Sequence, residues 1–444
     1  MFDFSEKDSC GVGFIASRNI PPTHGMTLKV LECLANLDHR GAKFADGTGD
    51  GAGVLTEIPF ELIRAELKEL SIDLDEKTKI GIISCFFDPK NVDESIDLIN
   101  EELERFGIKH LYWRKVPTDK QVLGDLAKKS KPSIYQGIIS AEKENHKEFE
   151  KKLFLFRKTL EKKIKEIDFL NIHINSCSSK TVVYKGLFTA TQTSDFYWDL
   201  RNPLYKTRFG IFHQRFSTNT SSTWDKAQPF RMLAHNGEIN TIQSNLSWMK
   251  AREVDASSSF WKDDIEKLKP FIDDGISDSG QLDNAIELLV RSGRTLAHSQ
   301  EMLIPSAWEN NPRFTNKEKA FYQYHAFLTE PWDGPAAIVA SDGKDIIAGL
   351  DRSGLRPLRW MISDRYVLAA SEVGICPSVE AGAFKTAQLE PGQTIRYRLE
   401  TDELLDESEV IQKLSDKNPY EDWVNSRPLI CLLYTSPSPR DNRT

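Results

Sequence analysis

The chain lacks any apolar run close to the roughly 20 residues that a membrane-spanning helix needs. Its first nine residues, MFDFSEKDS, have neither a basic start nor an apolar core, which argues against a secretory signal peptide. We therefore expect no membrane association and a soluble protein of the cytoplasm or, in a eukaryote, of a plastid.

Cysteines are few, and none is spaced like a metal ligand. The six stand at positions 10, 33, 85, 177, 376 and 431, without a CxxC pair. This pattern disfavours both a disulfide scaffold and a zinc site. We expect free thiols, a reducing compartment and no metal.

The chain also has no excess of basic residues, no internal repeat and no linker rich in glycine, proline or serine. With 58 Lys and Arg against 66 Asp and Glu, its net charge is −8, which disfavours a nucleic-acid surface. Its 444 residues would suffice for two or three average domains or for one large domain. We expect one large domain, in which the motif-poor region of about 90–195 is an elaboration.

Hydrophobic spacing predicts an α+β fold. Period-two or short apolar runs predict strands, and 3-4 spacing predicts helices. The predicted strands are 10–17, 53–58, 79–87, 110–116, 133–140, 181–189, 336–341, 345–350, 357–362 and 366–371, and the predicted helices are 26–37, 96–106, 149–167 and 281–292. Four glycines within 47–53 permit close backbone approach, but their order is not that of a phosphate loop.

The candidate nucleophile is Cys10, at the start of the first predicted strand. With residues 1–9 attached, Cys10 is an ordinary buried cysteine. With them removed, it carries a thiol and an α-amine on one carbon, so it can serve as nucleophile and base together. An α-amine titrates at roughly 7.7–8.0, so part of it is free to accept the thiol proton near neutrality.

Further blocks accompany Cys10-Gly11 in chain order. They are LANLDHRG at 34–41, GDGAG at 49–53, HQRFST at 213–218, AHNGEIN at 234–240 and SDS at 277–279. This array resembles the class II, N-terminal nucleophile, glutamine amidotransferases. EPWDGPAA at 330–337 and GLDRSGLRP at 349–357 narrow the resemblance to the glutaminase domain of the glutamate synthases, over roughly residues 10–425. AASE at 369–372 is similar to blocks found more widely in the class.

The resemblance implies a four-layer αββα sandwich and hydrolysis of L-glutamine through a thioester on Cys10. It assigns the oxyanion hole to Asn236 and Gly237, whereas an Asn-Gly pair taken alone is typical of a hairpin turn. Arg215 would bind the α-carboxylate, because a guanidinium offers a bidentate fork; the alternative is a surface salt bridge. Thr218 would add a hydroxyl donor.

Two further assignments come from the resemblance. Asp278 would bind the α-ammonium, and the competing interpretation is a helix N-cap, since Ser and Asp precede a periodic segment. Arg40 would support the strand that carries the nucleophile. His213 and His235 have no carboxylate or cysteine at a ligand spacing, so we interpret them as packed or hydrogen-bonded histidines.

The expected organisation is a cleavable leader at 1–9, the amidotransferase domain at 10–400 and the start of a connection at 401–426. Residues 427–444 resemble translated adapter sequence, and we expect an artefactual, disordered tail. The resemblance implies no cofactor in this chain. It places FMN and an iron–sulfur cluster in downstream regions that the chain lacks, together with 2-oxoglutarate and a small electron-donating subunit or ferredoxin.

Two rival functions stay open at this stage. One is the glutaminase domain of a different class II amidotransferase, and the other is a non-catalytic domain that senses glutamine.

Overall fold

Two antiparallel sheets lie face to face at the centre of the molecule. The computed structural model describes residues 10–75, 77–141, 144–215 and 222–426. The larger sheet has seven strands in the order β14-β12-β13-β1-β8-β2-β7, and the second has five in the order β16-β15-β11-β10-β9. Their bounds are β1 Gly11–Ser17, β2 Ala52–Glu57, β7 Thr181–Gly186, β8 Phe209–Gln214, β9 Leu233–Gly237, β10 Ala336–Ser341, β11 Asp345–Leu350, β12 Arg359–Ser363, β13 Tyr366–Ala370, β14 Ala383–Gln388, β15 Thr394–Arg398 and β16 Glu403–Leu405.

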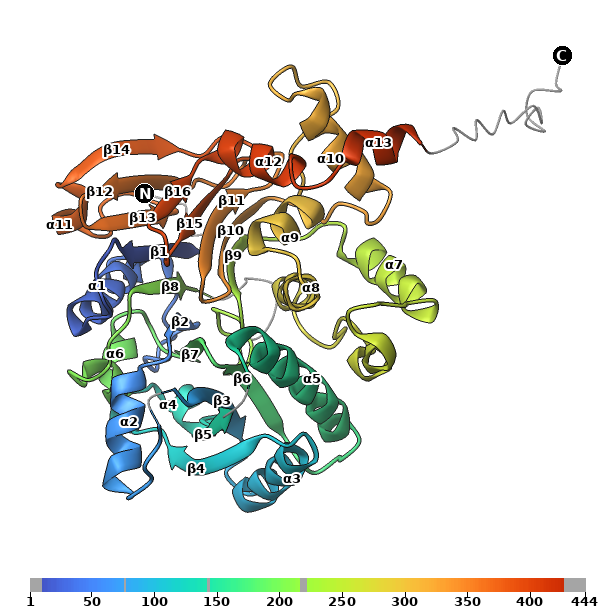
Figure 1. The fold of residues 1–444 in the computed structure, drawn as a ribbon. Helices are drawn as coiled ribbons and strands as arrows, with labels where there is room; N and C mark the ends of the chain where they lie inside the picture. Colours follow the sequence, from blue (N-terminus) through green and yellow to red (C-terminus); the bar gives the residue numbers. More distant parts are fainter. Residues whose placement is uncertain (1–9, 76, 142–143, 216–221, 427–444) are drawn as a thin grey trace, which may run out of the picture.

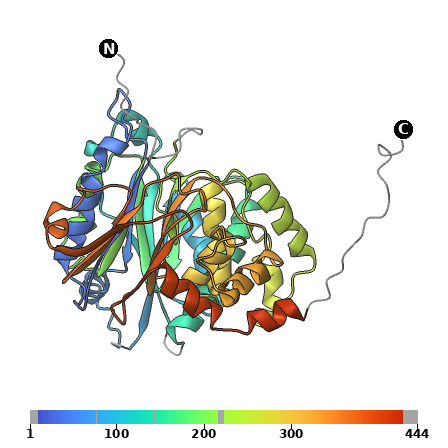
Figure 2. The same ribbon diagram turned by 90° about the horizontal axis from the view of Figure 1, so that it is seen from above.

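Helices cover the outer face of each sheet, which gives four layers (Figures 1 and 2). The seven-stranded sheet carries α1 (His24–Ala35), α2 (Phe60–Glu69) and α11 (Pro377–Glu380). The five-stranded sheet carries α8 (Asp278–Arg291), α9 (Leu296–Leu303), α10 (Asn316–Ala326) and α12 (Glu407–Ser415). The expected αββα sandwich is therefore confirmed.

Strand β1 shows how the sequence positions the sheets. Val12, Phe14 and Ala16 belong to the apolar cluster between the two sheets. Ile15 points the other way, into the cluster beneath α1. The continuous burial of β1, which has helix on one side and sheet on the other, explains why this segment is an unbroken apolar run with small residues rather than an apolar–polar alternation.

A third sheet, in the order β4-β5-β3-β6, is built from the motif-poor middle of the chain. Its strands are β3 Lys79–Phe87, β4 Lys109–Lys115, β5 Ser133–Ala141 and β6 Ile172–Ser178. Helices α3 (Val92–Arg105) and α5 (His146–Lys165) share an apolar cluster with this sheet. A short turn joins β6 to β7, and the two strands contact each other, so the third sheet adjoins the seven-stranded sheet.

The remaining elements are shorter or lie at the periphery. They are α4 Asp125–Lys129, α6 Gln192–Phe196, α7 Ile242–Val254, α13 Tyr420–Asn425 and the 3-10 turns Asp38–Arg40, Lys120–Val122, Trp198–Arg201 and Lys262–Leu268. Residues 401–426, where we expect a connection to begin, form β16, α12 and α13, and the two helices pack against α10. Among the described residues, no helix has the length and apolarity to span a membrane.

Candidate active site

Cys10 stands immediately before β1, in the middle of the larger sheet. Strand β1 is paired with β8 on one side and with β13 on the other. Close packing fixes its path: a Cβ on Gly13 would lie 2.5 Å from the carbonyl oxygen of Ala369 and 2.7 Å from the ring of Phe212. Cys10 itself is half-buried. The nucleophile predicted from the sequence thus directly precedes a closely packed central strand, with part of its surface accessible.

Asn236 touches Cys10 directly. Its side-chain Nδ2 donates to the carbonyl oxygen of Cys10 over 2.9 Å, although the two residues are 226 positions apart. Asn236 is buried, at the end of β9 in the second sheet. An amide nitrogen carries two hydrogens, so the contact with Cys10 leaves one donor for another acceptor.

Gly237 follows at a position that only glycine can occupy. Its φ is +147°, and a Cβ there would lie 1.7 Å from the carbonyl oxygen of Pro335. The chain does not return as a neighbouring strand: β9 pairs with β10, about 100 residues later, and the next element is α7. The hairpin interpretation of Asn236-Gly237 is therefore wrong.

Arg215 directly follows β8, whose last residue, Gln214, is opposite Gly11. The backbone N–H of Arg215 donates to Gly51 over 2.9 Å. The Arg215 side chain is 12% exposed, and its Nε lies 3.7 Å from Oδ2 of the buried Asp50. The ion pair is thus mostly buried, which contradicts the alternative of a surface salt bridge. Arg215 also has a φ of +86°, an uncommon conformation for a residue with a side chain.

Asp278 is the first residue of α8 and does not cap it. The N-cap is Ser277, whose side chain accepts from the N–H of Gly280. Oδ2 of Asp278 accepts from the N–H of Ile239 over 2.8 Å, and Oδ1 accepts from Ser279. The carboxylate therefore ties the start of α8 to the segment just after Gly237. The N-cap interpretation of Asp278 is wrong, and its place beside the 236–237 segment agrees with a position at the edge of the site.

Arg40 forms an ion pair with Glu372, with Nη2 2.9 Å from Oε2. Glu372 follows β13, the strand beside β1, so Arg40 is linked to the nucleophile strand through it. Thr218, the predicted leader 1–9 and the predicted tail 427–444 lie outside the described residues.

Burial sets the protonation of the groups around the nucleophile. Loss of solvent raises the pKa of the Cys10 thiol to about 11, while the positive charges of Arg215 and Arg356 oppose this rise and Asp50 adds to it. Burial lowers the pKa of His213 to about 3 and that of His235 to about 4. Both imidazoles are thus neutral near pH 7.

Both histidines are hydrogen-bonded. Nε2 of His213 donates to the carbonyl of His235 over 3.2 Å, and Nδ1 of His235 lies 2.7 Å from Oγ of Ser279. This agrees with the interpretation that they are packed histidines. Within the described ranges, no group of three or more His, Cys, Asp and Glu residues is placed to hold a metal ion.

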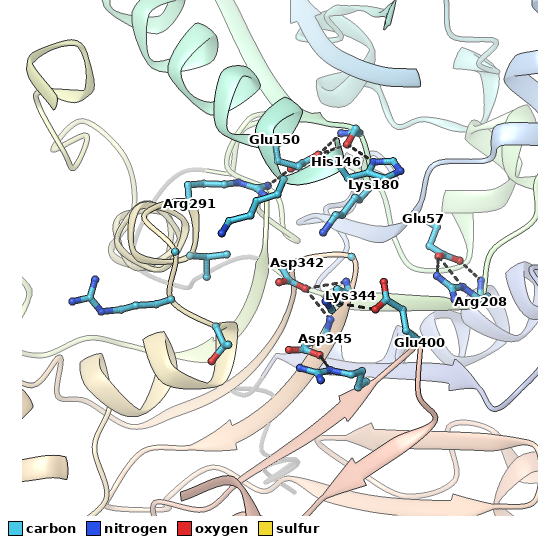
Figure 3. Close-up of a pocket in the computed structure, with 18 of the residues that line it drawn as sticks. Glu57, His146, Glu150, Lys180, Arg208, Arg291, Asp342, Lys344, Asp345 and Glu400 are labelled. Atoms are coloured by element: carbon cyan, nitrogen blue, oxygen red, sulfur yellow. Dashed lines mark hydrogen bonds and ion pairs between the residues drawn. The ribbon is translucent and has the colours of Figure 1, made fainter. Parts of the chain in front are cut away.

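A separate cavity of about 570 Å³ opens at the opposite ends of the central strands (Figure 3). It is lined by the end of β2, the start of β8 and the β10–β11 turn, and none of the predicted site residues lines it. Its acidic side chains are engaged by protein groups: Glu57 pairs with Arg208, Glu150 with Arg291 and Asp345 with Arg398. This cavity is therefore distinct from the Cys10 site.

Sequence reasoning did not assign three residues that the structure places at the Cys10 end. Asp50 contacts Arg215, Arg356 acts electrostatically on both Cys10 and His235, and Ser371 binds β1. Each lies within a block noted above, at 49–53, 349–357 or 369–372. Membership of a block was the only signal, because their partners are far away in the sequence.

A four-layer sandwich with a cysteine just before a central strand agrees with the class that the sequence motifs resemble. The family profile Glutamine amidotransferases class-II matches residues 10–423, so the chain belongs to that family.

Within the family, the chain is similar to glutamate synthases. It is 40% identical over 441 residues to the glutamate synthase [NADPH] large chain of Bacillus subtilis, covering 98% of this chain and 28% of the relative. It is 38% identical over 451 residues to the chloroplastic ferredoxin-dependent glutamate synthase of rice, Oryza sativa subsp. japonica, covering 99% and 28%. The chain thus spans about 28% of the length of these relatives. Among solved structures, the glutamine phosphoribosylpyrophosphate amidotransferase of B. subtilis overlaps 51% of this chain and 40% of its own, with 19% identity and a TM-score of 0.29.

Proposed function

We propose that this chain hydrolyses the side-chain amide of L-glutamine, with Cys10 as an N-terminal nucleophile once residues 1–9 have been removed. The observation that carries the proposal is the contact between Asn236 and the backbone of Cys10, which joins an oxyanion donor on one sheet to the nucleophile on the other. Arg215, beside them, supplies a cation for the carboxylate of an amino acid.

In the proposed reaction, the thiol sulfur of Cys10 attacks the amide carbon of glutamine while the α-amine of the same residue accepts the thiol proton. Asn236 Nδ2 and the N–H of Gly237 donate to the oxygen that becomes negative; one such donor is typically worth roughly 2.7–4 kcal/mol in the transition state. The carbon–nitrogen bond then breaks, and the α-ammonium returns its proton to the departing ammonia. Water, deprotonated by the α-amine, hydrolyses the thioester to glutamate and restores the thiol.

The burial of Cys10 explains why an internal base is needed. A thiol whose pKa is near 11 is almost entirely protonated at pH 7. The thiolate is therefore scarce while residues 1–9 are still attached to Cys10. An α-amine bonded to the same residue supplies a base within reach of the sulfur. The positive charges of Arg215 and Arg356 favour the thiolate and disfavour the ammonium form of that amine.

Arg215 and Asp278 would bind the two charged ends of the substrate. Arg215 lies across the ladder from the start of β1 and has a guanidinium suited to a carboxylate. The Asp278 carboxylate accepts hydrogen bonds from two backbone N–H groups. Because a carboxylate has about four acceptor positions, it can also accept from an ammonium group. Thr218 stays a predicted hydroxyl donor.

We further infer that the ammonia serves a glutamate synthase. The support is the similarity to the bacterial and plastid enzymes over almost the whole of this chain. Reductive amination of 2-oxoglutarate would take place in regions outside the chain, which would also hold the FMN and the iron–sulfur cluster. Electrons would come from a small NADPH-linked subunit or from ferredoxin, in the cytoplasm or a plastid.

Two measurements test the glutaminase proposal. Intact-mass analysis of the purified, active protein should show Cys10 at its N-terminus, and active protein that retains Met1 to Ser9 would contradict the mechanism. Cys10→Ser should lower glutamine turnover by at least 100-fold, whereas Cys33→Ser, which changes a thiol buried beneath the sheet, should leave it within about twofold.

A further inference from the structure

In the block 369–372, Ser371 contacts the strand that follows Cys10 from the β13 side, and Glu372 contacts the turn after α1. Strand β13 pairs with β1 as far as Ala370, which lies opposite Gly13. Beyond that pair, the N–H of Ser371 donates to the carbonyl oxygen of Val12 over 2.9 Å. The N–H of Val12 in turn donates to Oγ of Ser371 over 3.2 Å. A side-chain hydroxyl thus takes the place of a backbone carbonyl in the last step of the ladder.

Both partners in this contact are removed from water. Val12 is 0% exposed and Ser371 is 7% exposed. A buried N–H that loses its acceptor cannot be compensated fully by solvent, so the hydroxyl of Ser371 has a defined energetic role at residue 12. Alanine at position 371 would keep the backbone bond to Val12 and remove only the hydroxyl bond.

Glu372 fixes the position of this contact. Its carboxylate accepts from Arg40 through both Nε, at 3.2 Å, and Nη2, at 2.9 Å, and from Nε2 of His39 at 3.0 Å. Arg40 and His39 belong to the 3-10 turn that follows α1. The dipeptide Ser371-Glu372 therefore joins that turn to the backbone two residues after Cys10.

These contacts matter most if Cys10 becomes the first residue of the chain. A terminal residue frays unless its neighbours hold it. The described contacts that would hold it are the amide of Asn236 at its carbonyl, the β8 ladder at Gly11 and Ser371 at Val12. An error of about 1 Å in the placement of a nucleophile can lower the rate on the order of 100-fold.

We propose that Ser371 is a positioning residue for the nucleophile, and that Glu372 and Arg40 hold it in place. The proposal rests on the function proposed above. Ser371 contacts the strand and not the substrate, so its loss should lower kcat and leave substrate affinity nearly unchanged.

The test compares Ser371→Ala with Ser371→Thr, which retains a hydroxyl, and with Ser341→Ala as the matched control. Ser341 is also a buried serine at a strand end, with its hydroxyl bonded to the backbone of Asp345 and Gly343, but it lies at the opposite end of the sandwich. We expect Ser371→Ala to lower kcat for glutamine about 10- to 100-fold with KM within about twofold, and Ser371→Thr to recover most of the loss. Ser341→Ala should keep kcat within about twofold.

Hydrogen exchange supplies a readout that does not require turnover. Ser371→Ala should speed amide exchange in residues 11–13 at least tenfold, and Ser341→Ala should not. If Ser371→Ala proves too unstable to purify, Glu372→Gln, which weakens only a partly exposed ion pair, should show a smaller change in the same direction. An unchanged kcat and unchanged exchange in Ser371→Ala would overturn this proposal, as would an equal loss of kcat in Ser341→Ala. Normal turnover in Cys10→Ser would instead overturn the glutaminase mechanism itself.

Discussion

At the scale of single residues, two positions at the Cys10 end of the molecule have a positive φ. Arg215 has a φ of +86° and Gly237 a φ of +147°, and both stand at the ends of strands that converge on Cys10. For a residue with a side chain, such as Arg215, this conformation costs free energy and persists only where the surrounding contacts impose it, whereas glycine adopts it readily. Here the contacts are specific: Arg215 is held by the carbonyl of Gly51, and Gly237 is packed against Pro335.

The Gly237→Ala variant tests whether this geometry serves catalysis. A Cβ at 237 would lie 1.7 Å from the carbonyl oxygen of Pro335, so the backbone N–H must move away from the oxyanion position. We expect glutamine turnover to fall roughly 10²–10³-fold, as for loss of an oxyanion donor. Gly374→Ala is the control, because Gly374 also has a positive φ, +83°, but no atom lies within 4 Å of its Cβ position. It should cost about 1–2 kcal/mol in urea unfolding and leave kcat intact. Equal turnover in the two variants would contradict the role of Gly237.

Site residues with distinctive chemistry were predictable from the sequence. The residues that hold them in position were not. Cys10, Asn236 and Arg215 could be proposed because a thiol, an amide and a guanidinium suit particular steps of amide hydrolysis. The hydroxyl of Ser371 is chemically ordinary, and its partner Val12 lies 359 residues away. No local pattern encodes such a contact, because it arises only when β13 pairs with β1.

At the scale of elements, spacing predicted those with one apolar face. Helices α3 and α5 were both found close to their predicted bounds. The apolar residues of α5 that repeat at helical spacing pack on the third sheet, although the run Leu153 to Lys158 is buried on all sides. Helix α9 was missed because all eight of its residues are buried, including polar ones such as His298 and Glu301. A helix without an exposed face has no amphipathic period, so its sequence, LAHSQEML, carries little helical signal.

The burial of α9 leads to a prediction about pH. Burial raises the pKa of Glu301 to about 7, and the hydroxyl of Tyr322 donates to Oε2 of Glu301 over 2.7 Å. The folded protein thus holds a proton that the unfolded chain releases above about pH 4.5. The stabilising contribution of this carboxyl is complete below that pH and is lost as the pH rises through about 7.

Glu301→Gln removes this titration while keeping a polar group of similar size. Relative to the wild type, the variant should gain about 2–3 kcal/mol of unfolding free energy between pH 5 and pH 8, since one pKa unit corresponds to about 1.4 kcal/mol. Urea unfolding at both pH values measures the difference, and Glu309→Gln, at an exposed position, gives the baseline. A difference between wild type and Glu301→Gln that does not change with pH would show that Glu301 does not titrate in this range.

At the scale of the whole molecule, the site exists because two sheets present strand ends at the same edge. Strand β1 begins there, β8 ends there, and β9 of the opposite sheet ends there with Asn236 and Gly237. Spacing alone could give an α+β class but not this convergence, which depends on strand order and on how the sheets face each other. The resemblance to a known family supplied the sandwich, and the order β13-β1-β8 shows how it places Cys10 between two supporting strands.

The folded domain extends past residue 400 and includes helix α12. The sequence led us to end the amidotransferase domain at residue 400, yet Val410, Ile411 and Leu414 of α12 belong to the cluster beneath the five-stranded sheet. Burying three such side chains contributes about 5–9 kcal/mol, comparable with the 5–15 kcal/mol of net stability typical of a folded protein. A chain ending at residue 400 should therefore unfold at a much lower urea concentration than a chain ending at 426. A chain ending at 419, which lacks α13 and its ring contacts with α10, among them that of Tyr420 with Phe321, should fall between them. Identical urea midpoints for the chains ending at 400 and 426 would mean that the domain does stop near residue 400 and that α12 adds nothing to its stability.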